Sequence, residues 1–284
     1  MGQQNIHYFP GHMSRAIREM SSFIKSVDLV CEVVDSRAPL SSSNPLLADL
    51  IKNKQKIILL SKSDYSDEKT TQNWVKFFKN KGLVVTSGNL KKTKFINILN
   101  ELSTQILTKK REKEAKYGMI PQPVRIMIVG IPNVGKSTLI NNLKGSKVAV
   151  TGNKAGVTRA EQWINISKDY VVLDTPGILP MNYEDKQVAI RLALIGSMKE
   201  EVLPTEELAC YLLDILRNSY DDCLLSRFEI PSISSLSDEE ILLEIAKKRN
   251  LLENGKYSSS RAAYLLIKEF KDGILGKYSL EQPE

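Results

Sequence analysis

A glycine-framed loop in the middle of the sequence carries residues that can hold a chain of phosphates. Residues 130–137 read Gly-Ile-Pro-Asn-Val-Gly-Lys-Ser and match the pattern G-x-x-x-x-G-K-[ST]. Backbone N–H groups of such a loop approach phosphate oxygens, and the positive end of the following helix faces them. We expect Lys136 to reach the β- and γ-phosphates of a nucleotide and the Ser137 hydroxyl to coordinate Mg²⁺. The other expected phosphate contacts come from Asn133, Val134, Gly135 and Thr138.

A second motif, Asp-Thr-Pro-Gly at residues 174–177, ends the apolar run Tyr170–Leu173. We expect Asp174 to hold Mg²⁺ through water and the Gly177 N–H to sense the γ-phosphate. Thr158 lies between the two motifs, as a Mg²⁺-binding switch threonine should, although an ordinary loop hydroxyl is the alternative. Many GTPases place a water-orienting Gln directly after this motif, but Ile178 stands there and cannot activate water.

A base-reading element, Ser61-Lys62-Ser63-Asp64, lies well before the phosphate loop. A carboxylate at Asp64 can accept hydrogen bonds from N1–H and the 2-amino group of guanine, whereas adenine offers neither. The aliphatic stem of Lys62 would cover the ring. The usual element is Asn-Lys-x-Asp, and the shorter Ser61 raises the question of whether it reaches both the base and the phosphate loop. A backbone contact to the guanine oxygen is expected from Ser87, Gly88 and Asn89.

The order of these motifs is unusual, because an ordinary GTPase begins with the phosphate loop and places the base-reading loop late. A fold entered at a different strand explains this order, so the sequence predicts a circularly permuted GTPase. Apolar runs at residues 27–34, 56–60, 83–86, 124–129 and 170–173 alternate with helical stretches at 13–25, 68–80 and 92–116. Such alternation predicts an α/β fold with a mostly parallel sheet and helices on both faces.

Helical periodicity continues after the last strand, over residues 185–200, 205–217, 237–250 and 260–271, with Ser259 or Ser260 as an expected N-cap. The sequence therefore predicts two domains. Residues 1–180 form the permuted P-loop GTPase domain, and residues 181–284 form an all-helical, RNA- or ribosome-binding domain.

Charge is distributed unevenly along the 284 residues. Residues 1–180 hold 27 Lys and Arg against 14 Asp and Glu, whereas residues 181–244 hold 5 against 14. A basic nucleotide-binding domain suggests a polyanionic partner such as nucleic acid, with solvated surface lysines as the alternative. No apolar run approaches the roughly 18 residues that a membrane span needs. The three cysteines lack C-x-x-C spacing, which favours reduced thiols in a cytoplasmic protein and argues against zinc.

With the permuted order, the N-terminal Tyr8-Phe9-Pro10-Gly11-His12-Met13, the phosphate loop and Asp35-Ser36-Arg37-Ala38-Pro39, the chain resembles the ribosome biogenesis GTPase A family. The resemblance covers nearly the whole length. It implies a cytoplasmic factor in late assembly of the large ribosomal subunit, stimulated by that subunit and in contact with its rRNA. It also implies that His12 is the catalytic residue. The alternative is a non-catalytic histidine that caps a helix or faces the solvent. By analogy with related permuted GTPases, Asn133 would help to bind K⁺.

We therefore expect a GTP- and GDP-binding, Mg²⁺-dependent GTPase, monomeric away from the ribosome and without membrane contact. Its RNA contacts would include basic residues of the helical region, namely Lys247, Lys248, Arg249, Arg261 and Lys268. One rival is a nucleotide-gated RNA-binding scaffold with negligible hydrolysis, which the absent Gln favours. Another is a metabolic ATPase or kinase, against which Asp64 argues.

Overall fold

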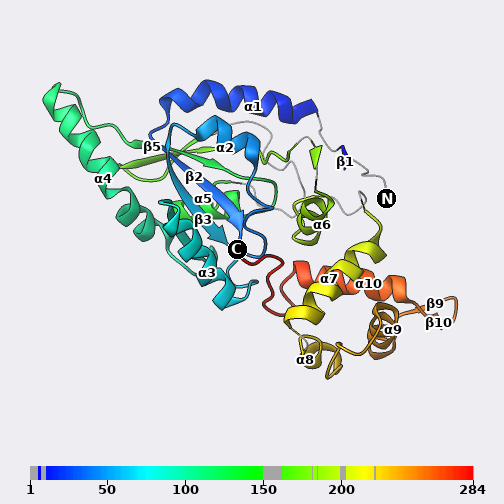
Figure 1. Cartoon of the computed structure of the whole chain (residues 1–284). Helices are drawn as coiled ribbons and strands as arrows, with labels where there is room; N and C mark the ends of the chain where they lie inside the picture. The colour runs from blue at the N-terminus through cyan, green and yellow to red at the C-terminus, as the bar shows by residue number, and fades with distance from the viewer. Residues whose placement is uncertain are drawn as a thin grey trace.

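A six-stranded sheet forms the centre of the first part of the chain in a computed structural model (Figure 1). The structure describes residues 6–7, 11–149, 162–180, 182–183, 185–198, 203–220 and 222–283. The strand order is β4-β3-β2-β5-β7-β6. In chain order the strands are β2 (Leu29–Asp35), β3 (Gln55–Ser61), β4 (Val84–Gly88), β5 (Val124–Val129), β6 (Gln162–Asn165) and β7 (Tyr170–Asp174).

The sheet is parallel except for β6, which pairs antiparallel with β7. All seven residues of β2 are buried, as are all five of β7, because helices cover both faces of the sheet. The expected mostly parallel α/β fold with a permuted strand order is therefore confirmed. Strands β2, β3 and β4 come first in the chain, and β5, which precedes the phosphate loop, is inserted beside β2.

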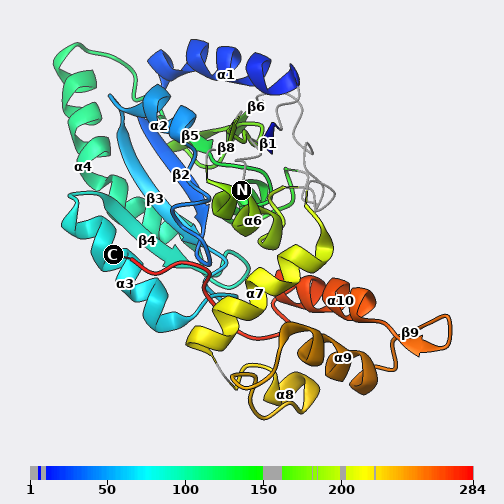
Figure 2. The ribbon, with the colours of Figure 1, turned by 45° about the vertical axis from the view of Figure 1, so that its right-hand side comes forward.

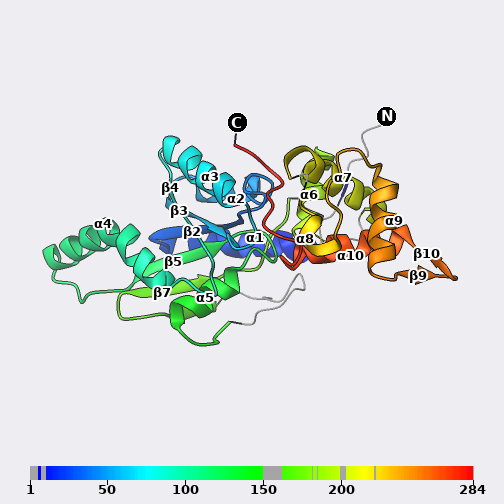
Figure 3. The ribbon, with the colours of Figure 1, turned by 90° about the horizontal axis from the view of Figure 1, so that it is seen from below.

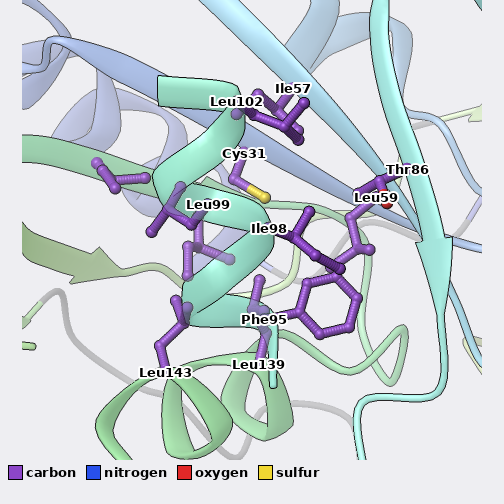
Figure 4. Close-up of a pocket in the computed structure, with 12 residues that line it drawn as sticks. Cys31, Ile57, Leu59, Thr86, Phe95, Ile98, Leu99, Leu102, Leu139 and Leu143 are labelled. Carbon is purple, nitrogen blue, oxygen red and sulfur yellow. The ribbon is translucent and has the colours of Figure 1, made fainter. Parts of the chain in front are cut away.

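Helices α4 (Phe95–Lys116) and α5 (Lys136–Lys144) cover one face of the sheet. Phe95, Leu99 and neighbouring apolar side chains of α4 point toward Cys31 and Leu59 on the strands, around a small apolar pocket (Figure 4). Burial raises the pKa of the Cys31 thiol to about 12, so the group is protonated at neutral pH. Helix α3 (Glu68–Asn80) covers the opposite face, where Trp74 packs with buried residues of β2, β3 and β4.

Helices α1 (Gly11–Phe23) and α2 (Pro45–Ile51) complete the first part, and a 3₁₀ turn η1 (Ile24–Ser26) follows α1. Asn44 caps α2, because its side chain accepts a hydrogen bond from Leu46 N. A short strand β1 (Ile6–His7) pairs antiparallel with β8 (Asn182–Tyr183). Ile6 and His7 therefore lie beside residues of the chain that follows β7.

The second part is helical, as expected, and its helices gather to one side of the sheet (Figure 1). They are α6 (Lys186–Leu194), α7 (Thr205–Ser219), α8 (Leu225–Phe228), α9 (Asp238–Lys248) and α10 (Ser259–Lys271). The expected N-cap of the last helix was wrong by one residue, since Ser258 accepts the hydrogen bond from Arg261 N. A short hairpin of β9 (Leu252–Glu253) and β10 (Lys256–Tyr257) was not expected. Within the described residues, none of the helices is long and apolar enough to cross a membrane.

The C-terminal tail, residues 278–283, returns to the sheet. Figure 2 shows this red segment running from the helices back to α3, and Figure 3 shows it between α3 and α7. The Glu281 carboxylate accepts hydrogen bonds from Leu40 N at 2.8 Å and Ser41 N at 3.0 Å. The Trp74 indole donates to the Glu281 carbonyl at 3.3 Å. The tail therefore binds the loop that follows β2 and the helix α3 together.

Candidate nucleotide-binding site

The expected nucleotide-binding loops all leave the sheet at the carboxyl ends of its parallel strands. In the strand register, Asp35 lies beside Ser61, and Ser61 lies beside Gly88. On the other side of β2, Glu32 pairs with Val129, after which the phosphate loop begins. Ligands of open α/β sheets bind at this edge. Two groups of loops that are far apart in the chain thus meet across the end of β2.

The phosphate loop between β5 and α5 depends on glycine at its two ends. A Cβ atom at Gly130 would lie 2.4 Å from the Val33 carbonyl oxygen, which no side chain could tolerate. Gly135 has a φ of 105° and is the N-cap of α5, so no side chain occupies the end of that helix. The first N–H groups of α5 are therefore positioned for an anionic ligand, as the sequence predicts.

Lys136, the first residue of α5, folds back on this loop. Its ammonium donates to the carbonyls of Gly130 at 3.1 Å and Ile131 at 2.8 Å. Burial lowers the pKa of Lys136 to about 8, and the charge of Asp174 partly offsets this shift. Phosphate oxygens are stronger acceptors than carbonyls, so a bound nucleotide would draw the ammonium toward itself.

The Asp-Thr-Pro-Gly motif packs directly against the phosphate loop. Asp174 is the buried last residue of β7, and the Thr175 hydroxyl donates to the Ile128 carbonyl at 2.6 Å. A Cβ atom at Gly177 would lie 2.6 Å from the Pro132 nitrogen, so only glycine allows this close approach. Ile178 is fully buried, and its carbonyl accepts a hydrogen bond from Asn44. An Ile178 side chain in the core cannot orient a water molecule.

Ser61 connects the base-reading loop to the phosphate loop. Its hydroxyl lies 2.6 Å from the Val134 carbonyl and 2.9 Å from the Val34 carbonyl, and the residue is fully buried. Although serine is shorter than the usual asparagine, the Ser61 side chain does reach the phosphate loop. Its contact with a base stays a prediction.

Lys62 and Asp64 follow at the end of β3. Lys62 has a φ of 54°, and its ammonium lies 2.9 Å from Asp35 Oδ2. Burial lowers the pKa of Lys62, whereas the neighbouring Asp35 carboxylate raises it. Ser63 and Asp64 are half-buried. Asp64 is therefore partly accessible to solvent, and its contact with a base stays a prediction.

The third base-side loop begins where β4 ends. Ser87, Gly88 and Asn89 are half-buried, and Gly88 pairs with Ser61 on the neighbouring strand. The Asn89 side chain accepts a hydrogen bond from Lys91 N at 2.8 Å and so shapes the turn. The Asn89 carbonyl also accepts from Lys92 N and Thr93 N, and the contact of this loop with guanine stays a prediction.

Two of the predicted residues cannot be placed fully. Thr158 lies outside the described residues. The backbone of His12 lies in the first turn of α1, but its side chain is outside the part of the chain that the structure describes.

Two features of the site were missed by sequence reasoning. Asn133 Nδ2 donates to the Gly196 carbonyl at 2.7 Å, so the phosphate loop contacts the C-terminal end of α6. The buried Asp35 and Arg37 form an ion pair beside Lys62. For the second, the sequence offered the run Asp35-Ser36-Arg37-Ala38-Pro39, which supports the family resemblance but does not indicate a buried ion pair.

We expect Asp64→Asn to reverse the preference of the protein for guanine over xanthine nucleotides. An amide presents a donor where guanine also presents donors, whereas the C2 carbonyl of xanthine accepts that donor. One bidentate base contact is worth about 1–3 kcal/mol, so the ratio of the GDP and XDP dissociation constants should change by roughly 5- to 150-fold. Asp67→Asn is the control, because Asp67 caps α3 and should leave the ratio unchanged. An unchanged ratio in the Asp64 variant would remove Asp64 from the base site.

Ser61→Ala should weaken GDP binding by up to about tenfold, since one neutral hydrogen bond contributes about 0.5–1.5 kcal/mol. The loss of the contact with the Val134 carbonyl would loosen the two loops relative to each other. Ser66→Ala is a matched control, because Ser66 bonds Thr71 in the same region without touching the phosphate loop. Equal GDP dissociation constants for the two variants would show that the Ser61 contact has no role in binding.

Comparisons with known proteins found similar sequences and structures over nearly the whole chain. The profile of a family described as "50S ribosome-binding GTPase" matches residues 125–247. Ribosome biogenesis GTPase A of Bacillus licheniformis is 38% identical over 98% of this chain and 99% of its own length. The protein of the same name from Thermotoga maritima is 34% identical over 98% of this chain and 94% of its own length. The structure of GNP-bound YlqF from T. maritima superposes with a TM-score of 0.66 at 31% identity, covering 95% of this chain and 99% of that one. The structure of its GDP-bound form has a TM-score of 0.69, covering 94% and 99%.

Proposed function

Because the chain belongs to the ribosome biogenesis GTPase A family, we propose that it hydrolyses GTP on the large ribosomal subunit and promotes late maturation of that subunit. The coarser statement, that it is a GTPase of ribosome biogenesis, follows from the family itself. The matching profile of 50S ribosome-binding GTPases supports the large subunit as partner. The observation that carries the enzymatic part is the contact between Ser61 and the Val134 carbonyl, which joins a guanine-reading loop to a phosphate loop.

GTPases of this kind generally use Mg²⁺, which neutralises charge that develops on the phosphates. The donor set of the site fits the ion, since Ser137 lies in the first turn of α5 and Asp174 is the last residue of strand β7, which pairs with β5. Ser137, Thr158 and, through water, Asp174 are the proposed Mg²⁺ ligands. A K⁺ ion beside Asn133 is a further proposal, made by analogy with related permuted GTPases.

His12 is the proposed catalytic residue, which would orient or activate the attacking water. The pairing of β1 with β8 supports this role, because it holds the segment that leads to His12 beside the chain leaving Gly177. The buried Ile178 adds support, since that position offers no polar group to the water.

A change between the GTP-bound and GDP-bound forms would be transmitted to the helical part through the chain that follows Gly177. In the permuted order this chain passes through Ile178 directly to α6, with no further strand of the main sheet between them. A γ-phosphate that pulls on the Gly177 N–H would therefore displace α6 with little intervening structure. The close packing of Gly177 on the phosphate loop supports this route.

The proposed division of the chain stays at residue 180, with a nucleotide-binding domain before it and a ribosome-binding helical domain after it. The proposed location is the cytoplasm, where ribosomes are assembled, and the proposed state away from the ribosome is monomeric.

The five basic residues proposed to contact RNA differ in their exposure to solvent and in the contacts that they already make. Lys247, Lys248, Arg261 and Lys268 are exposed, and the two lysines of α9 lie in surface ion pairs with Glu244 and Glu229. Such pairs contribute little and exchange easily for phosphates. Arg249 is half-buried, lies over the Phe228 ring and bonds the Arg227 carbonyl. Its role is structural support of the helical part.

Replacing the four exposed basic residues Lys247, Lys248, Arg261 and Lys268 with glutamine should weaken binding to large ribosomal subunits. Each lost phosphate contact should reduce the slope of log K against log salt by about 1. The measurement is co-sedimentation with separated subunits over a range of salt concentrations. A variant that exchanges Lys for Arg and Arg for Lys keeps the charges and should bind normally. If the glutamine variant binds like the wild type, or if binding does not depend on salt, these residues are ordinary surface charges that do not contact RNA.

The decisive experiment for the proposed function is GTP turnover with and without purified large and small subunits, with ATP as competitor. We expect large subunits alone to raise turnover and ATP not to compete. Subunit binding without any turnover would instead establish a nucleotide-gated scaffold. Equal use of ATP would contradict the assignment of the base site.

A further inference from the structure

The end of β2 and the loop after it form a buried ion pair at the carboxyl edge of the sheet. Asp35 and Arg37 are both fully buried, and Arg37 Nε and Nη2 each lie 2.9 Å from one carboxylate oxygen. Burial alone would raise the pKa of the Asp35 carboxyl, but Arg37 and Lys62 hold it well below its usual range. Two charges taken out of water cost free energy, and such pairs are best attested where they fix one arrangement of parts. The partners of each member indicate which parts are fixed here.

Asp35 faces the base-reading loop. Its Oδ2 atom accepts from Lys62 at 2.9 Å and from Arg37 Nη2 at the same distance. Lys62 is the residue expected to cover the guanine ring. It follows β3 with a φ of 54°, and its ammonium contacts Asp35 at the end of β2. The position of the Lys62 side chain is therefore set by a carboxylate that Arg37 holds.

Arg37 faces the helical part on its other side. Its Nη1 atom donates to the Phe270 carbonyl at 3.2 Å, and its Nη2 atom donates to the Ile195 carbonyl at 3.3 Å. The guanidinium carbon also lies 5.5 Å from the centroid of the Tyr65 ring and 5.3 Å from that of the Phe270 ring. Ile195 is the C-cap of α6, and Phe270 lies in the last turn of α10. Helix C-termini carry partial negative charge, which favours a cation there.

The same end of α6 also contacts the phosphate loop. The Gly196 carbonyl, next to Ile195, accepts from Asn133 Nδ2 at 2.7 Å. One turn of chain at residues 195–196 is thus bonded to the base side through Arg37 and to the phosphate side through Asn133. A nucleotide that bridges both sides would act on this turn from two directions.

We propose that Arg37 is a positioning residue that couples Lys62 of the base-reading loop to the C-terminal ends of α6 and α10. Binding of a guanine nucleotide and docking of the helical part onto the sheet are then energetically linked. If Lys62 moves away from Asp35, the carboxylate that binds Arg37 loses one of its two cations. If Arg37 moves with the helix ends, the buried Asp35 carboxylate loses its other cation. The linkage is reciprocal, so docking of the helices favours guanine nucleotides in return. This proposal rests on the proposed nucleotide site but not on the ribosome as partner.

Arg37→Lys tests the proposal while it keeps a positive charge beside Asp35. One ammonium cannot replace two parallel bonds to a carboxylate together with bonds to two helix ends. We expect the dissociation constant for GDP to rise about tenfold, within the usual range of coupling between sites. The dissociation constant for inorganic pyrophosphate, which contacts only the phosphate loop, should not change. In the wild type, GDP should slow hydrogen exchange at the amides of Ile195 and Asp272, and this effect should vanish in the variant.

Arg191→Lys is the matched control. Arg191 of α6 also joins the helical part to the tail, through Glu281 at 3.4 Å, and it bonds the Tyr211 hydroxyl of α7 at 2.9 Å. The structure gives it no contact with Asp35 or Lys62. Its replacement should speed exchange equally with and without GDP, and it should leave the GDP effect intact. If Arg37→Lys behaves like Arg191→Lys, the coupling does not run through Arg37.

A second variant covers the case in which Arg37→Lys does not fold. Lys62→Met removes the other end of the link from a partly exposed position. At saturating GDP it should lose the GDP-dependent protection at Ile195 and Asp272. Full protection in this variant would overturn the proposal. A wild-type protein that binds no GDP would instead contradict the proposed nucleotide site, so the two failures are distinguishable.

Discussion

Lys136→Ala is expected to weaken GDP and GTP binding by about 2–5 kcal/mol, or roughly 1.5 to 3.5 orders of magnitude in the dissociation constant. The Lys136 ammonium is the one charge that the phosphate loop itself brings to the β- and γ-phosphates. Truncation would leave those oxygens facing neutral groups in a buried setting. Binding can be measured by competition with a fluorescently labelled GDP or by calorimetry.

The fold should survive this change, because without nucleotide the lysine bonds only the carbonyls of Gly130 and Ile131. Thermal unfolding should therefore stay cooperative. Lys144→Ala is a control on the same helix, since Lys144 bonds the Asn165 carbonyl at the far end of α5. A Lys136 variant that unfolds cooperatively and binds GTP like the wild type would show that the loop assignment is wrong.

His12→Ala should lower subunit-stimulated GTP turnover by about 10²–10⁴-fold if His12 performs acid–base chemistry, and by less if it only positions water. Nucleotide affinity should stay nearly constant, because the phosphate and base contacts come from other loops. The measurement is single-turnover hydrolysis with saturating large subunits, alongside the GDP dissociation constant.

The chain offers its own control, since it has two histidines. His7→Ala changes the residue that pairs with Asn182 in the short strand β1, and it should leave stimulated turnover largely intact. Wild-type turnover in the His12 variant would make His12 structural. The catalyst would then have to come from RNA or from another side chain.

Elements with strong local signals were predicted at or near their observed bounds. The expected helix 68–80 and strand 124–129 coincide with α3 and β5, because an N-capping Asp67 and a run of apolar residues mark them locally. The expected helix 185–200 was too long, since α6 ends at Leu194 and Gly196 follows with a φ of 77°. The pattern of apolar residues continued past that turn and concealed it.

The loops of the site could be predicted because each depends on residues close together in the sequence. The contacts between loops could not. Arg37 reaches Phe270 across 233 residues and Ile195 across 158, and no spacing rule connects such pairs. The same holds for Ser61 and Val134, where the reach of a short hydroxyl depends on how closely β3 approaches the phosphate loop.

The contact between Glu281 and the loop after β2 has a consequence for folding during translation. Leu40 is translated 241 residues before the carboxylate that holds its N–H. At about 5–20 residues per second, that interval is on the order of 10–50 s. The strand that separates the base side from the phosphate side is thus made early, and the loop at its end is secured late. The nascent chain therefore completes this edge of the sheet only when translation has passed through the whole helical part.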